Sequence, residues 1–355
     1  MNLLQHSVVR CQTQGHRTAR HVLLSARYGH VEPVGVPCST SIEAVKTMTS
    51  IRSIHRIIGS SGGLGLAATI ARAAHAQVTV VYVSDLFAAA DMAWSKLCAQ
   101  VQAISRTPVD QLIFDLRGHG DSGSPPASTV TTLEDLASDL ASVVESVHTP
   151  VVLVGHSMGT MVIQRFAGSH RVRFSGQVRG VVLVNPAASA PLCDPALHRI
   201  LRVSAVLRPR RGRGPLNTFT RVGQVVLHRR RRTFPIAPGR RAARDVLRAD
   251  LRVVADVLVA ASQFETDRSS AAMLACTAVR LVAAQHDRIT PPSDARLLAG
   301  LIPGARLHVV AGDSHDLPRT HPHVCARAIC EVLSGLPEGP HAALSSSPQV
   351  ERPTL

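Results

Sequence analysis

The chain has 355 residues, 45% of them hydrophobic, so it can bury a large core, and an intrinsically disordered protein is excluded. The formal net charge of +15 comes almost entirely from arginine, because Lys46 and Lys96 are the only lysines. We expect no nucleic-acid partner, since aromatic residues are not interleaved with the basic ones and no zinc-ligand spacing is present.

The cysteines and the hydropathy pattern bear on the cellular compartment. The seven cysteines are odd in number and form no C-x-x-C pair, which is typical of reduced thiols in a cytoplasmic protein. No run of about 18 uncharged apolar residues predicts a membrane span. Residues 1–20 also lack the apolar segment of a secretory signal, so we expect a cytoplasmic location.

The N-terminal part of the chain has the weakest pattern. Residues 1–52 show little periodicity, and we expect a poorly defined extension there. The run Gly59-x-x-x-Gly63-x-Gly65 then precedes a segment with helical periodicity, and Asp85 follows the next apolar run. This order resembles the dinucleotide-binding turn of short-chain dehydrogenases. No Tyr-x-x-x-Lys follows, so we favour a helix packed on a sheet, or a diverged front end of the sheet, over a cofactor site.

From residue 78 onward, buried strands alternate with helices. Six runs are apolar throughout, as in strands covered on both faces, at residues 78–83, 111–116, 151–155, 178–185, 279–285 and 305–312. Helical patterns occur at residues 92–105, 132–147, 158–168, 293–301 and 321–334. This alternation predicts an α/β fold with a mostly parallel sheet flanked by helices.

The alternation is interrupted between Asn185 and Val279. Helical periodicity at residues 195–208 and 240–262 predicts a helical cap inserted between two strands of the core. The expected organisation is a core at residues 53–190 and 276–336, the cap at 191–275, and a Pro/Ser-rich disordered tail at 337–355.

The predicted cap is strongly basic. Residues 194–270 hold 17 arginines against six acidic residues, and Arg229 to Arg232 are consecutive. One interpretation is a solvated basic surface. The other is peripheral docking on an anionic membrane, where each basic residue near the surface contributes about 1 kcal/mol. The sequence leaves both interpretations open.

The run Gly155-His156-Ser157-Met158-Gly159 lies between an apolar strand and a helical segment. A serine in this G-x-S-x-G context is presented on a sharp strand-to-helix turn, and the flanking glycines let the strand and helix approach closely. The start of the helix behind it favours negative charge. We therefore expect Ser157 to be a nucleophile.

A nucleophilic serine needs a base that an acid orients, and in this scaffold the chain order is serine, acid, histidine. Asp287 follows the strand at 279–285 and His315 follows the strand at 305–312, so both are expected at the sheet edge that carries Ser157. The other candidates are Asp294 and Asp313 as the acid and His156, His286, His321 and His323 as the base. We expect His156, next to the serine on the tight turn, to point elsewhere.

Four features together resemble the α/β-hydrolase superfamily and are similar to its actinobacterial-type esterases and lipase-like members. They are GHSMG, DLRGHGDS at residues 115–122, and the loops of Asp287 and His315. The resemblance spans about residues 78–335. It implies that Ser157, His315 and Asp287 form a catalytic triad that needs no metal or organic cofactor. In the family the DLRGHGDS loop shapes the rim of the site, so Asp115, Arg117 and His119 are expected to be structural.

The resemblance also implies an oxyanion hole formed by the backbone amides of Met158 and Leu86. Trp94 stands where the family often has a tryptophan, but Ser84 and Asp85 replace the family's His-Gly. An inward-facing Asp85 carboxylate opposes the negative charge of the intermediate, so we expect a slow enzyme. The two hairpin strands that usually open this fold are not visible in the sequence.

The sequence thus predicts a serine hydrolase that cleaves a carboxylester, a lipid ester or a thioester through an acyl-enzyme. Two alternatives stay open. One is a weak or inactive hydrolase-fold protein that acts by binding, and the other is a dehydrogenase-like N-terminal region. The substrate and the oligomeric state do not follow from the sequence, because fold analogy does not define them.

Overall fold

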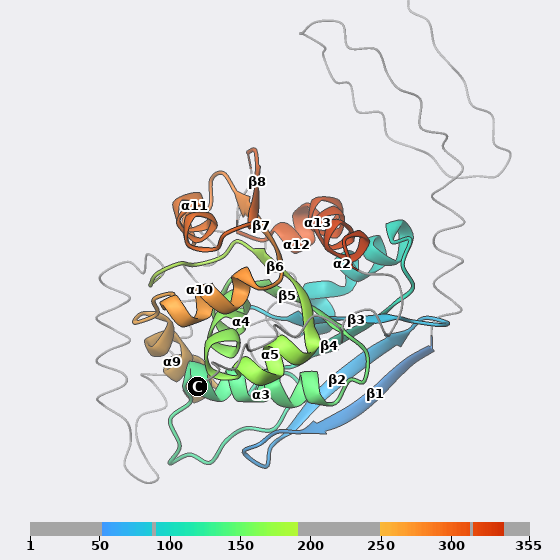
Figure 1. Cartoon of the computed structure of the whole chain (residues 1–355). Helices are drawn as coiled ribbons and strands as arrows, with labels where there is room; N and C mark the ends of the chain where they lie inside the picture. The colour runs from blue at the N-terminus through green and yellow to red at the C-terminus, as the bar shows by residue number, and fades with distance from the viewer. Residues whose placement is uncertain (1–51, 87–89, 191–248, 313–314, 337–355) are drawn as a thin grey trace, which may run out of the picture. The chain divides into compact units, whose positions relative to one another are not determined.

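The computed structural model of the chain describes residues 52–86, 90–190, 249–312 and 315–336 (Figure 1). All of these residues belong to one compact unit, residues 44–355. The predicted extension at 1–52 and tail at 337–355 lie outside the described residues, apart from Arg52, and stay predictions.

Eight strands of the described chain form one sheet in the order β1-β2-β4-β3-β5-β6-β7-β8. The strands are β1 (Arg52–Gly59), β2 (Gly65–Arg72), β3 (Val78–Val83), β4 (Val109–Phe114), β5 (Val151–His156), β6 (Val178–Val184), β7 (Ala278–Ala284) and β8 (Arg306–Val310). β2 runs antiparallel to both β1 and β4, and every other neighbouring pair is parallel. The carboxyl ends of β3 to β8 therefore meet at one edge, where their loops can share a site.

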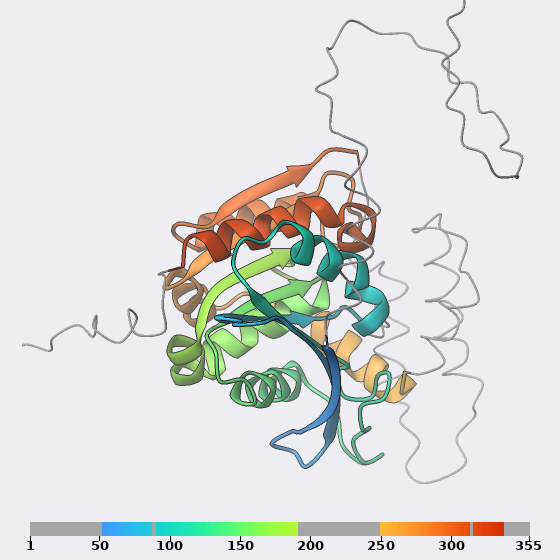
Figure 2. The same cartoon turned by 90° about the vertical axis from the view of Figure 1, so that its right-hand side faces the viewer.

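The parallel strands are apolar because helices cover both faces of the sheet (Figures 1 and 2). Along β5, Val151 and Leu153 pack into one core cluster, while Val152 and Val154 pack into a second cluster on the opposite face. Helices that contribute to the first cluster are α3 (Leu133–Glu145), α4 (Met158–Ser169), α5 (Arg171–Gln177), α9 (Leu251–Ala261), α10 (Arg268–Ala275) and α11 (Pro292–Leu301). Helices that contribute to the second are α2 (Ala90–Ile104), α12 (Leu317–Thr320) and α13 (Pro322–Ser334).

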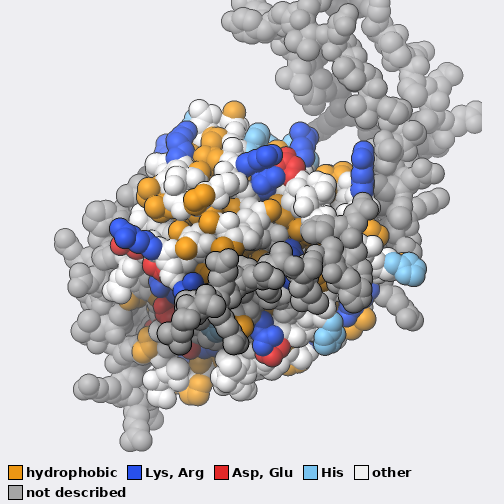
Figure 3. Space-filling model, in the orientation of Figure 1, with side chains coloured by type: hydrophobic (Ala, Val, Ile, Leu, Met, Phe, Trp, Pro, Cys, Tyr) orange, Lys and Arg blue, Asp and Glu red, His pale blue; other side chains and the backbone are white. Residues whose placement is uncertain are grey.

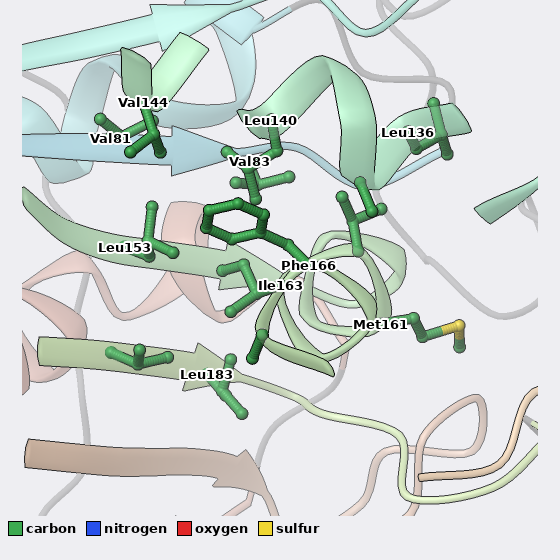
Figure 4. Packing of buried hydrophobic residues seen from close by; sticks show 14 of the residues in the cluster. Val81, Val83, Leu136, Leu140, Val144, Leu153, Met161, Ile163, Phe166 and Leu183 are labelled. Carbon is green, nitrogen blue, oxygen red and sulfur yellow. The ribbon is translucent and has the colours of Figure 1, made fainter. Parts of the chain in front are cut away.

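The first cluster fixes α4, the helix that follows the nucleophile candidate, against the sheet. Figure 4 shows the ring of Phe166 of α4 among Val83 of β3, Leu140 of α3 and Ile163 of α4. All four side chains are fully buried. Helix α4 is therefore held against β3 and α3 by apolar contacts.

The described elements confirm the predicted fold. The six predicted strands are present as β3 to β8, and the five helical patterns from residue 92 onward correspond to α2, α3, α4, α11 and α13, each within a few residues of the predicted bounds. The α/β-hydrolase architecture, a mostly parallel sheet flanked by helices, is the one observed.

The prediction of a helix after the glycine-rich run was wrong, and the opening hairpin that was not visible in the sequence is present. Residues 52–72 do not form a helix but the hairpin β1–β2, paired antiparallel from Arg52 opposite Arg72 to Gly59 opposite Gly65. Along β2 every second residue is buried, as expected of a strand with one face on the core. Gly63 has a φ of 75° in the connecting turn, a conformation that favours glycine. The dinucleotide-binding hypothesis fails, because it needs a helix after the glycines.

Most of the predicted cap lies outside the described residues, including the helix expected at 195–208 and the Arg229 to Arg232 run. The described part, from residue 249, contains α9 and α10, whose apolar side chains belong to the first core cluster. On the face shown in Figure 3, the described Lys and Arg side chains lie in several separate places. Docking on an anionic membrane therefore stays a prediction.

Two further sequence expectations concern single features of the described residues. None of the described helices is both long enough and apolar enough to cross a membrane. The four described cysteines, Cys98, Cys276, Cys325 and Cys330, are free thiols.

The DLRGHGDS loop after β4 is held by its own polar side chains. Asp115 accepts a hydrogen bond of 2.9 Å from the amide of Ala90 at the start of α2. Arg117 donates two hydrogen bonds, of 2.6 and 2.8 Å, to Asp139 of α3, and both side chains are buried. Nδ1 of His119 lies 3.0 Å from the carbonyl oxygen of Arg117. These contacts tie the loop to α2 and α3 and agree with the structural roles expected for it.

Candidate active site

Ser157 lies on the turn between β5 and α4, and its backbone is in the left-handed region with a φ of 52°. A Cβ at Gly159 would overlap the carbonyl oxygen of Val83, so a glycine is needed for α4 to begin this close to β3. A Cβ at Gly155 would come 2.9 Å from the backbone of Gly159. The amide of Ser157 donates a 3.0 Å hydrogen bond to Val184 of β6. The turn is therefore closely held and presents the serine at the start of α4.

His315 lies between Ser157 and Asp287. Its Nε2 is 2.7 Å from Oγ of Ser157, and its Nδ1 is 2.6 Å from Oδ2 of Asp287. An ionised carboxylate only accepts hydrogen bonds, so Nδ1 carries the ring proton and Nε2 is the acceptor for the serine hydroxyl. The three side chains thus form one hydrogen-bonded chain across the carboxyl ends of β5, β7 and β8.

Asp287 is buried just after β7. Burial raises its pKa, but hydrogen bonds from His315 and from the amides of Ile289 (2.8 Å) and Thr290 (3.1 Å) outweigh burial and lower the pKa below its ordinary value. The carboxylate is therefore ionised at neutral pH. An ionised Asp287 fixes the tautomer of His315 and stabilises a positive charge on the imidazole.

Thr290 joins the acid to the base. Its hydroxyl lies 2.9 Å from Oδ2 of Asp287, 3.2 Å from Nδ1 of His315 and 3.0 Å from the carbonyl oxygen of Asn185. A hydroxyl has one proton, so it donates either to Asp287 or to Asn185, and towards the protonated Nδ1 of His315 its oxygen can only accept. The side chain is buried and confines the carboxylate to the orientation that meets His315.

The main chain of His315 is held as well. Its carbonyl oxygen accepts a hydrogen bond of 2.7 Å from Nε2 of His156 and one of 2.5 Å from Nδ2 of Asn185. His156 precedes the nucleophile candidate, and Asn185 follows β6. The base is therefore connected to two further strands of the sheet through its own peptide group.

Met158 and Leu86 follow neighbouring parallel strands, because Val83 of β3 pairs with Gly155 of β5. Met158 begins α4 directly after the serine, and the amides of a first helical turn lack partners within the helix. Leu86 is half-buried three residues after β3 ends. Both backbones thus lie at the sheet edge that carries Ser157. Their action as an oxyanion hole stays a prediction, since residues 87–89 lie outside the described chain.

The residues that replace the family's His-Gly have different surroundings. Oγ of Ser84 accepts a 2.9 Å hydrogen bond from the indole N–H of Trp94, and both side chains are buried. Oδ2 of Asp85 lies 3.9 Å from Nδ1 of His156, and its side chain is 16% exposed. Burial lowers the pKa of His156 to about 4, so this histidine is neutral at neutral pH and makes no ion pair with Asp85.

The other acids and histidines considered for the triad lie elsewhere or make other contacts. Oδ2 of Asp294, in the first turn of α11, accepts a 3.3 Å hydrogen bond from the amide of Ala188. His286 is exposed beside the buried Asp287. His321 and His323 pair with each other, with ring centroids 5.8 Å apart. Asp313 lies outside the described residues.

Sequence reasoning missed three residues of this site, Thr290, Asn185 and His156. Thr290 stands three residues after the acid, a spacing at which a hydroxyl can reach back to a carboxylate, and this was the clearest available signal. Asn185 is the first polar residue after an apolar strand and has a φ of 46°. His156 is part of the nucleophile motif itself, and nothing in the sequence connects it to a segment that lies 159 residues away.

Among the described residues, no three His, Cys, Asp or Glu side chains are grouped so that they could hold a metal ion. The polar atoms of the site are instead directed at one another. This arrangement can transfer a proton from Ser157 to His315, while Asp287 stabilises the protonated imidazole.

Comparison with known proteins identifies the family of this chain. A model of the Alpha/beta hydrolase family matches residues 87–328. Similar solved structures include an esterase from Thermogutta terrifontis (21% identity, TM-score 0.58, 79% of this chain and 98% of that chain) and the enol-lactonase from Burkholderia xenovorans LB400 (21%, 0.59, 79% and 100%). A bromoperoxidase from Bacillus anthracis is also similar (15%, 0.60, 79% and 100%). None of the curated proteins compared with the chain matches it. The chain belongs to the alpha/beta hydrolase family.

Proposed function

We propose that this protein is a serine hydrolase that cleaves an ester-type bond through an acyl-enzyme intermediate. The observation that carries the proposal is the hydrogen-bonded chain from Ser157 through His315 to Asp287, with distances of 2.7 and 2.6 Å. Each of the three follows a different strand, so the arrangement depends on the fold as a whole.

In the proposed reaction, Oγ of Ser157 attacks the carbonyl carbon of the ester while Nε2 of His315 takes the hydroxyl proton. The carbonyl oxygen becomes negative, and the amides of Met158 and Leu86 are the proposed donors to it. The tetrahedral intermediate collapses as His315 protonates the departing alkoxide or thiolate. Water, deprotonated by His315, then attacks the acyl-enzyme and releases the carboxylic acid and Ser157.

Ester-type substrates are favoured over other groups for a chemical reason. An activated serine with a neighbouring base attacks an electrophilic carbonyl, and the alkoxide or thiolate of an ester or thioester leaves more readily than the amine of an amide. The titles of two similar structures, an esterase and an enol-lactonase, name reactions of this class. Carboxylesters, lipid esters and thioesters all remain within the proposal.

One observation favours a second candidate, a protein that binds an ester-like ligand with weak or no turnover. Asp85 replaces a glycine of the family in the loop that carries Leu86. Its carboxylate points towards His156, the residue before the nucleophile candidate. A negative charge close to a developing oxyanion disfavours the intermediate and leaves ligand binding less affected.

Labelling with a fluorophosphonate probe separates the two candidates. We expect the wild-type chain to be labelled and the Ser157→Ala variant not to be. Ser175→Ala, an exposed serine on α5, is the matched control and should be labelled like the wild type. A folded wild-type protein that takes up no label, or a Ser157→Ala variant labelled equally, would contradict the hydrolase assignment.

A further inference from the structure

We propose that Asn185 and His156 are positioning residues that hold the general base in place through two hydrogen bonds to the main-chain carbonyl of His315. This role rests on the proposed serine-hydrolase function. It concerns the peptide group of the base rather than its imidazole, and neither residue touches the reacting atoms.

The side chain of Asn185 has both of its polar atoms engaged. Nδ2 donates to the carbonyl oxygen of His315 at 2.5 Å, and Oδ1 accepts from the amide of Ala284 at 2.8 Å. A carbonyl can only accept and an amide N–H can only donate, so these partners fix which end of the side-chain amide is which. The backbone of Asn185 is tied as well, because its N–H donates to Val282 at 2.7 Å. Asn185 therefore links β6, β7 and the loop of the base.

His156 reaches the same carbonyl oxygen from the strand of the nucleophile. Its Nε2 lies 2.7 Å from the oxygen of His315, and because that oxygen only accepts, Nε2 carries the ring proton. The centroids of the two imidazole rings are 5.0 Å apart. His156 precedes Ser157, so it connects β5 directly to the loop of the base.

The base needs these hydrogen bonds because β8, the strand before it, is only weakly packed into the sheet. β8 is the last strand of the sheet, and its residues alternate between exposed and half-buried until Val310. The peptide of His315 is instead anchored to β5 and β6, which are interior strands. Displacing a catalytic group by about 1 Å can cost roughly 10²-fold in rate. Loss of the hydrogen bonds to the His315 carbonyl should therefore lower kcat.

A purely structural role would also explain two buried hydrogen bonds, so the test needs a matched control. Gln164 provides one, because it is a fully buried side-chain amide with the same kind of partners. Its Nε2 donates to the carbonyl of Ala187 at 2.9 Å, and its Oε1 accepts from the hydroxyl of Thr266 at 2.6 Å. Ala187 belongs to the loop after β6 and Thr266 to the segment before α10, whereas the base lies in the loop after β8. Asn185→Asp and Gln164→Glu each turn one such amide into a carboxyl group of the same size.

The experiment measures kcat and KM on a p-nitrophenyl ester from pH 6 to 9, together with thermal melting. We expect kcat of Asn185→Asp to fall about 10- to 100-fold below that of the wild type at pH 9, with KM within threefold. The ratio should shrink toward pH 6, because a protonated carboxyl group at position 185 can donate to His315 again while an ionised one cannot. The described titratable side chains around position 185 are those of His156, Asp287 and His315. Taking the ratio of the two kcat values at each pH removes the pH dependence that both proteins share.

Gln164→Glu should melt at a lower temperature yet keep wild-type kcat at every pH. If both variants lose kcat equally, or if Asn185→Asp turns over like the wild type throughout, the positioning role is wrong.

A second pair keeps the proposal testable if Asn185→Asp does not fold. His156→Gln retains a donor that can reach the carbonyl of His315, whereas His156→Leu does not. We expect His156→Leu to lose kcat and His156→Gln to recover most of it. Equal kcat in the two variants would overturn the role of His156. An inert wild type that takes no fluorophosphonate label would instead overturn the proposed function, so the two failures are distinguishable.

Discussion

The loops that carry the acid and base differ from the loop that carries the expected oxyanion donor, although all of them lie at one edge of the sheet. On the base side, Asp287, Thr290 and Asn185 are buried and bonded to one another or to His315. On the oxyanion side, Ser84 accepts a hydrogen bond from Trp94, and Asp85 is partly exposed beside the neutral His156.

The two sides differ in what fixes the positions of their groups. The base side is fixed by polar side chains that satisfy each other, so removing one leaves a buried partner unsatisfied. The oxyanion side depends on backbone amides whose place is set by the pairing of β3 with β5 and by the close approach of Gly159. A side-chain change there alters charge more than position.

The largest effects should come from breaking the base side at its centre. Ser157→Ala and His315→Ala should each lower kcat by roughly 10⁶, and the double variant should lose little more, because the groups act as a unit. The measurement is hydrolysis of p-nitrophenyl esters, with thermal melts to check folding. Losses that simply multiply in the double variant would show that the two residues act independently.

Asp287→Asn should cause the next largest loss of kcat. An amide nitrogen at the place of Oδ2 would donate to Nδ1 of His315, which forces the proton onto Nε2 and costs up to about 10⁴ in kcat. Asp294→Asn is the matched control, since Asp294 bonds the amide of Ala188 instead. If Asp294→Asn is the more damaging of the two, the acid has been assigned to the wrong residue.

Desolvation on the base side should also be visible as a pH dependence of stability. Burial lowers the pKa of His156 to about 4 in the folded state, against about 6.5 in the unfolded chain. Between these two pH values the unfolded chain binds a proton at His156 and the folded chain does not. The free energy of unfolding therefore decreases as the pH falls from about 6.5 to about 4. The shift corresponds to roughly 3 kcal/mol.

Urea unfolding of the wild type and His156→Gln at several pH values between 4 and 7 measures this contribution. The variant should lose less stability over that window, because glutamine does not titrate. His75→Gln, at a histidine outside the site, should keep the wild-type slope. Identical slopes for wild type and His156→Gln would contradict the assigned burial effect.

The smallest effect is expected on the oxyanion side. Asp85→Gly should raise kcat, because it removes a negative charge next to the expected donor and restores the glycine of the family. The gain should stay well below the factor of about 10² to 10³ that one oxyanion donor is worth, since Met158 still acts. Ser84 is best left unchanged, because its replacement would leave the buried indole N–H of Trp94 without its acceptor.

Asp85→Asn separates the two causes, because it removes the charge but keeps the Cβ. A gain in both variants would identify the charge, and a gain in Asp85→Gly alone would identify the backbone. An unchanged or lower kcat in a well-folded Asp85→Gly variant would mean that the loop already positions Leu86, and that the chain does not differ from the family here in any way that slows it.

The sequence by itself determined the parallel part of the sheet, β3 to β8, and pointed to the side chains of Ser157, Asp287 and His315. Each buried strand carries its own apolar run, and Ser157 is marked by a local strand-turn-helix motif. Asp287 and His315 each follow such a strand, so the rule that parallel strands end at one edge was enough to bring them together.

Only the tertiary structure decided the hairpin and the support of the base. The run around Gly59 to Gly65 fits a helix start or a turn equally well, and the alternation of Leu66, Ala68 and Ile70 acquires meaning only when β2 packs against β4 and the core. The hydrogen bonds of Asn185 and His156 to His315 span 130 and 159 residues. Such contacts leave no local pattern, because a polar residue at a strand end looks the same in the sequence whether it faces water or a buried carbonyl.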